Sequence, residues 1–140
     1  MNNQTLSPAD IQSIFDASPF ISSVGMQVVS ADLDKGQLTV RVPMKPEFER
    51  RKDSGQWHGG PIASVIDTVG DLAVGMLVGR GLPTVNFRVD YFRPAVQTAL
   101  IVVATVRRNG RSVGVADVDV YNENDVLLAI GRATYATATT

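Results

Sequence analysis

The chain of 140 residues contains no cysteine and carries almost no net charge. Without cysteine it can form no disulfide bond, no thiolate metal site and no cysteine nucleophile. Its 13 basic and 14 acidic residues give a net charge of −1, which supplies no general field that would attract nucleic acid or an anionic membrane. We therefore expect no nucleic-acid partner and no membrane partner, and any phosphate binding has to be local.

Long uninterrupted hydrophobic runs are also lacking. The most apolar stretch, residues 61–78, contains Asp67 and Asp71, so it suits a buried helix better than a membrane span. The first ten residues are polar and lack the basic-then-apolar order of a signal peptide. This favours a cytoplasmic location. Because the length is close to the usual size of one domain, we expect a single domain, residues 1–140.

The first third of the chain predicts a short helix followed by a hairpin. Ser7 is suited to cap a helix that starts at Pro8, and this helix is expected to close before Pro19. Residues 25–31 and 37–43 have strand-like patterns on either side of a turn at 34–36. The charged segment 44–56 contains Pro46 and Gly55 and predicts a loop.

The remainder predicts one long helix and four strands. Apolar residues recur at helical spacing from Gly59 for about five turns and stop near residues 79–81. The opposite face is also largely apolar, so protein should surround this helix. Strand-like patterns follow at residues 85–91, 99–108, 112–121 and 126–135. Runs of adjacent strands favour an antiparallel sheet that curls around the helix, which is an α+β fold.

Local motifs accompany this order of elements: Gly55, then His58-Gly59-Gly60, then Asp67 nine positions after the histidine, then Tyr91-Phe92-Arg93-Pro94. Together they resemble the phenylacetyl-CoA-thioesterase-like branch of the hotdog thioesterases, over nearly the whole chain after about residue 25. The resemblance implies a hotdog fold, with a curved antiparallel sheet wrapped around one long central helix. It also implies an acyl-CoA thioesterase that forms a homodimer, often a homotetramer, and uses no metal or redox cofactor.

The glycines before the long helix are candidates for carbonyl polarisation. Such glycines let the backbone approach a ligand and leave amide donors unpaired at the positive end of the helix dipole. The resemblance implies that the Gly59 N–H polarises the thioester carbonyl, that His58 shapes the turn, and that Gly60 lies beside the substrate. The alternative is an ordinary helix start with Pro61 at its first position.

Asp67 is the candidate catalytic carboxylate. An ionised acid next to Ile66 and Val69 is costly unless it is paired or used, and the resemblance implies a nucleophile or a general base for water here. The alternative is a structural acid held by hydrogen bonds or an ion pair. The resemblance also implies a role for Thr84 in contacting water or substrate, although threonine is common at the start of a strand.

The spacing of these residues bears on assembly. Gly59 and Asp67 are eight residues apart, so along one helix their separation is about 12 Å. One chain therefore cannot direct both at one carbonyl, and a site that uses both needs the acid of one subunit opposite the glycine turn of another. We expect a symmetric homodimer as part of the mechanism.

Asp71 lies one turn after Asp67 on the same helix face. Two interpretations are open for its carboxylate. It orients water or a hydroxyl of the acyl group, or it pairs with a base such as Arg88 across the interface.

Further candidates for substrate binding lie around the glycine turn. Lys52 stands six residues before His58, where the family commonly carries an asparagine or glutamine. Asp53, Ser54 and Gln56 are the candidates to replace that side chain. Trp57 is expected to line an acyl pocket or simply to pack. Two basic groups are candidates for CoA phosphates, although exposed arginines often only solvate a surface; they are residues 50–52 and the arginines 107, 108 and 111.

Two other functions remain open at this point. A hydratase or dehydratase of the same fold would use His58 and an aspartate from another subunit as an acid–base pair. A protein that binds acyl-CoA without turnover is the other alternative, because Lys52 replaces the usual amide. Release of free thiol from a thioester distinguishes the hydrolase from both.

Overall fold

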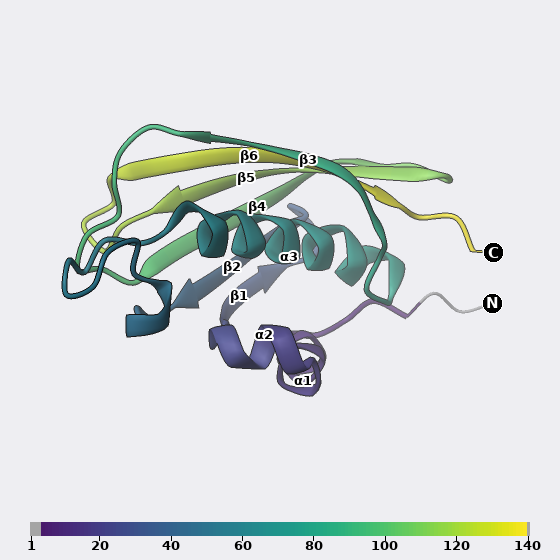
Figure 1. The fold of residues 1–140 in the computed structure, drawn as a ribbon. Helices are drawn as coiled ribbons and strands as arrows, with labels where there is room; N and C mark the ends of the chain where they lie inside the picture. The colour runs from purple at the N-terminus through teal and green to yellow at the C-terminus, as the bar shows by residue number, and fades with distance from the viewer. Residues whose placement is uncertain (1–3, 140) are drawn as a thin grey trace.

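A long helix, α3 (Gly59–Val78), lies along one face of a six-stranded sheet in the computed structural model, which describes residues 4–139 (Figure 1). Two short helices precede the first strand. The other elements follow the chain in this order: α1 (Pro8–Ala17), α2 (Pro19–Val24), β1 (Gln27–Asp32), β2 (Gln37–Val42), the 3-10 helix η1 (Pro46–Phe48), β3 (Thr84–Tyr91) after α3, β4 (Leu100–Asn109), β5 (Val113–Tyr121) and β6 (Leu127–Ala136).

The strands form one antiparallel sheet in the order β1-β2-β4-β5-β6-β3. After α3 the chain runs to the far side of the sheet, where β3 pairs with β6, so β1 and β3 are the edges. Figure 1 shows the sheet curving over the helix. The predicted α+β fold, a curved antiparallel sheet around one central helix, is therefore confirmed.

The core lies between the sheet and α3. Alternate residues of β2, β4 and β5 are buried, as expected for strands with one face against a helix. The helix contributes its own buried apolar row to the same cluster. Its main members are Leu38, Val40, Leu100, Val102 and Val118 from the strands and Val65, Ile66, Val69 and Leu72 from the helix.

Glycines in the sheet set how closely α3 approaches. A Cβ atom added at Gly131 would lie 2.6 Å from a methyl carbon of Ile66, and one added at Gly114 would lie 2.6 Å from a methyl carbon of Val74. A larger residue at either position would push the helix off the sheet. The middle of α3, which carries Asp67, is therefore held against β5 and β6.

By length and composition α3 is apolar enough to cross a membrane, with a mean hydropathy of 1.6 over 18 residues. However, 56% of that window is buried inside the protein. The helix is the centre of the core, which agrees with the interpretation of residues 61–78 as a buried helix.

The N-terminal region differs in detail from the prediction. Ser7 caps α1 as expected and Asp10 bonds back to the Ser7 amide, which completes a capping box. A second short helix, α2, was not predicted, although Ser18 and Pro19 repeat the Ser-Pro start of α1. The first strand begins at Gln27 because Gly25 ends α2 in the left-handed conformation, with φ 83°.

Candidate active site

The start of α3 presents one amide donor. His58 is the N-cap, and its Nδ1 accepts a hydrogen bond from the Gly60 N–H at 2.9 Å. The Gly59 N–H, at the first helical position, has no acceptor among residues 4–139. It is a free donor at the positive end of the helix dipole. The Gly60 amide is already engaged by His58, so a substrate contact from Gly60 stays a prediction.

Tyr91 fixes the carbonyl side of the same turn. Its hydroxyl donates to the Gly59 carbonyl oxygen at 2.6 Å, and burial raises the pKa of Tyr91, which favours the protonated donor. Tyr91 was part of the motif but was not predicted as a site residue. Its role depends on a contact across 32 positions of sequence, which no local pattern reveals.

Asp67 and Thr84 lie together. The Thr84 hydroxyl donates to Oδ1 of the half-buried Asp67 at 2.7 Å. The Tyr135 hydroxyl donates to the Asp67 backbone oxygen at 2.6 Å, which adds a second attachment at this turn. Two residues that were proposed for catalysis from the sequence are thus in direct contact.

Asp71 supports the turn that leads to Thr84. Its Oδ1 accepts a hydrogen bond from the Leu82 N–H at 2.7 Å. Burial raises the pKa of Asp71 to about 7, the charge of Asp67 adds to the rise, and the Leu82 hydrogen bond opposes it. Within the chain Arg88 pairs with Asp90 at 3.2 Å. Pairing of Asp71 with Arg88 of another subunit stays a prediction.

A groove of about 510 Å³ borders Gly59. Gln56, Trp57 and Ile62 line it from one side and the segment after β3 from the other. The Trp57 ring is 3% exposed, stacks on Phe48 with 4.9 Å between ring centroids, and donates its indole N–H to the Thr98 carbonyl. Trp57 therefore packs in the core and also forms a wall of the groove.

Lys52 and Arg111 lie apart from this groove. Lys52 is exposed in the turn of the 50–54 loop and lines none of the cavities described. Arg111 lines a different cavity with Val78 and Arg80, at the far end of α3. Since α3 has 20 residues, this end is about 28 Å from Gly59 along the helix axis. A contact of Arg111 with the same substrate stays a prediction.

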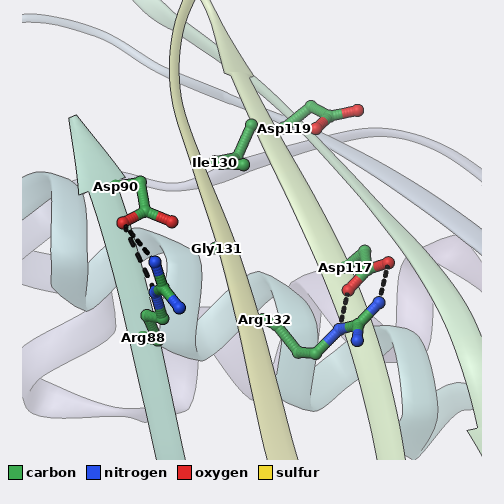
Figure 2. Close-up of a pocket in the computed structure, with 7 residues that line it drawn as sticks. All are labelled: Arg88, Asp90, Asp117, Asp119, Ile130, Gly131 and Arg132. Carbon is green, nitrogen blue, oxygen red and sulfur yellow. Dashed lines mark hydrogen bonds and ion pairs between the residues drawn. The ribbon is translucent and has the colours of Figure 1, made fainter. Parts of the chain in front are cut away.

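Another cavity, of about 360 Å³, lies on the face of the sheet turned away from α3 (Figure 2). Its arginines are occupied by neighbouring carboxylates: Arg132 pairs with Asp117 at 2.6 Å, and Arg88 pairs with Asp90. The hydrogen bond from Arg132 lowers the pKa of Asp117. This cavity is lined neither by Gly59, which carries the free amide donor, nor by Asp67. It is therefore not the candidate active site.

The candidate site therefore consists of two halves on one helix. Gly59 with Gln56 and the groove form one half, and Asp67 with Thr84 forms the other. The halves are eight residues apart on α3, about 12 Å along its axis.

Comparisons with known proteins identify the family of the chain. Residues 54–129, more than half of the chain, match the family model described as Thioesterase superfamily. The chain is 29% identical over 132 residues to the medium/long-chain acyl-CoA thioesterase YigI of Escherichia coli, with 84% of each chain covered. It superposes on zebrafish thioesterase superfamily member 2 with a TM-score of 0.83 and 25% identity, covering 96% of this chain and 100% of that one.

A third similarity, to the Escherichia coli PaaI protein from the phenylacetic acid degradation operon, has a TM-score of 0.74 at 22% identity and covers 89% of this chain and 88% of that one. At this identity the similarity establishes the fold alone. The chain belongs to the thioesterase superfamily and is a hotdog-fold thioester hydrolase. The resemblance found in the sequence is confirmed, and hydrolysis is favoured over the hydratase and binding-protein alternatives.

Proposed function

We propose that the protein hydrolyses acyl-CoA thioesters at a site shared by two subunits, with Asp67 of one subunit opposite the Gly59 N–H of the other. The observation that carries this proposal is the combination of a free amide donor at Gly59 and a carboxylate tied to Thr84 at 2.7 Å. An acyl-CoA substrate agrees with the name of the relative YigI.

The chemistry follows from these two groups. In the general-base route, Asp67 removes a proton from water, the water oxygen bonds to the thioester carbonyl carbon, and the Gly59 N–H stabilises the resulting oxyanion. The C–S bond then breaks, and the thiolate of CoA takes up a proton while the carboxylic acid leaves. In the nucleophilic route, an Asp67 oxygen bonds to the carbonyl carbon and the C–S bond breaks, so that CoA leaves and takes up a proton. Water then hydrolyses the mixed anhydride, which frees the carboxylic acid and regenerates Asp67. Either route needs an ionised Asp67, which the Thr84 hydroxyl orients.

The edge strand β3 supports the shared site. An edge strand offers unpaired backbone groups to a second chain, and β3 also exposes apolar side chains, with Val85 59% and Phe87 41% accessible. Large exposed apolar groups next to an open edge favour pairing of β3 with β3 of a second subunit. That pairing would place two α3 helices next to each other. Assembly of two dimers into a homotetramer, and a cytoplasmic location, stay predictions.

The test compares Asp67→Asn with wild type in a panel of acyl-CoA thioesters, by release of free thiol. The amide keeps an acceptor for Thr84 and removes the charge, so we expect release to fall by more than about 10³-fold while the variant stays dimeric. Asp34→Asn, the same change at an exposed acid in the β1–β2 turn, is the matched control and should be fully active. Full activity of Asp67→Asn would remove Asp67 from the mechanism.

A further inference from the structure

The groove beside Gly59 continues into a second cavity. This second cavity, of about 350 Å³, is lined by Arg50, Arg51 and Gln56. Arg50 and Gln56 line both cavities, so the two spaces adjoin. Gln56 is three residues from Gly59, which limits their separation to about 11 Å. A ligand whose carbonyl is bound at Gly59 can therefore extend along the groove to these arginines.

Arg93 brings positive charge to the same groove from the segment after β3. It lines the groove together with Arg50, and the side chains of Arg50, Arg51 and Arg93 belong to exposed residues. The four arginines that form ion pairs within residues 4–139 all lie on strands, and none of them is one of these three. Among the described residues, no aspartate or glutamate lines either cavity.

The nearest acid of the loop is used internally. Both oxygens of the Glu49 carboxylate accept backbone hydrogen bonds, one from the Gly55 N–H at 2.6 Å and the other from the Asp53 N–H at 3.4 Å. Glu49 therefore folds the 50–54 turn and is not paired with the neighbouring arginines. The positive charge of this end of the groove is left available to an anion.

The backbone around the groove is held in place before any ligand arrives. Gln56 forms an isolated bridge with Val96, and the Gln97 N–H donates to the Gly55 carbonyl at 2.8 Å. Gly55 has φ 67°, and a Cβ atom there would lie 2.6 Å from Cγ of Gln97, so this close crossing requires glycine. The crossing ties the loop that carries Arg50 to the segment that carries Arg93.

The walls between Gly59 and the arginines are largely apolar. Trp57, Ile62, Phe92, Pro94 and Ala95 provide them. A ligand that fits this groove has an uncharged arm next to its carbonyl and several negative charges at its far end. We propose that Arg50, Arg51 and Arg93 form a subsite for the phosphates of a CoA thioester, an inference that rests on the proposed function. Arginine is well suited to this role because its guanidinium donates to two phosphate oxygens at once.

The test uses two thioesters of one acyl group, acyl-CoA and acyl-pantetheine, which lacks the nucleotide phosphates. For Arg50→Ala and Arg93→Ala we expect KM for acyl-CoA to rise about tenfold each, the size of one lost charge-assisted hydrogen bond. KM for acyl-pantetheine and kcat for both substrates should stay at the wild-type values, which also shows that the variants are folded. Lys35→Ala, which removes an exposed charge from the β1–β2 turn, should change none of these constants.

Salt and free CoA provide independent readings. In the wild type KM for acyl-CoA should rise with ionic strength, and the double variant Arg50→Ala/Arg93→Ala should lose most of this dependence. Calorimetry should show weaker binding of free CoA to the same variants. This measurement tests the subsite even if the wild type hydrolyses neither thioester. That lack of hydrolysis would contradict the proposed function but not the subsite. Equal effects on both thioesters, or a loss confined to Arg111→Ala, would overturn the subsite.

Discussion

Replacing Gly59 by proline removes the amide hydrogen that stabilises the oxyanion in the proposed mechanism. The backbone accepts this change, because proline suits the first position of a helix and His58 already has the extended conformation, φ −66° and ψ 146°, of a residue before proline. Gly59→Ala is the matched control. Any Cβ at this position lies 3.2 Å from the Tyr91 hydroxyl, so both variants crowd Tyr91, and only the alanine keeps the N–H.

The expected loss follows from the role of the donor. Removing one oxyanion donor lowers kcat by about 10²- to 10³-fold. The kcat of Gly59→Pro, measured by thiol release at saturating substrate, should therefore be lower than that of Gly59→Ala by this factor. KM should differ little between the two, because the oxyanion exists only in the transition state. Equal kcat values for the proline and alanine variants would refute the assignment of the Gly59 amide.

Two further variants test the other half of the site. Thr84→Val removes the hydroxyl that donates to Asp67 and should lower kcat about tenfold, whereas Thr84→Ser should retain it; equal rates for Val and Ser would exclude the hydroxyl. In the folded protein the pKa of Asp71 is about 7, against an ordinary 3.8. Between these two pH values the folded state holds a proton on Asp71 that the unfolded chain has released. Its contribution to stability, at most about 4 kcal/mol, is present below pH 4 and is lost as the pH rises to 7. Asp71→Asn keeps the acceptor for Leu82, and its unfolding free energy should fall less between pH 4 and 7; an unchanged pH slope would contradict this.

The fold was accessible from the sequence because its strongest signals are local. The apolar rows of α3 repeat at helical spacing, and Gly79 ends the helix in the left-handed conformation, with φ 99°, where the pattern stopped. The strands alternate and are separated by turn residues. The helix α2 was missed because six residues give too short a window for a periodic pattern.

The site was only partly accessible, because its contacts are distant in sequence. The resemblance named Asp67 and Thr84, but the 2.7 Å contact between them depends on the path of the chain from α3 to the far edge of the sheet. The Tyr91 bond to Gly59 and the crossing that brings Arg93 near Arg50 also join distant segments. The backbone hydrogen bonds of Glu49 were also not predicted. An acid next to three basic residues in sequence is expected to form an ion pair with one of them, whereas Glu49 accepts from the Gly55 N–H.

The most direct test of the shared site is complementation between two inactive variants. Subunits that carry Asp67→Asn are mixed in equal amounts with subunits that carry Gly59→Pro and allowed to exchange. If each site takes Asp67 from one subunit and Gly59 from the other, every mixed dimer has one intact site, and activity should return to about a quarter of the wild-type value. If mass spectrometry detects mixed dimers and the mixture is no more active than either variant alone, the two groups do not act across a subunit interface.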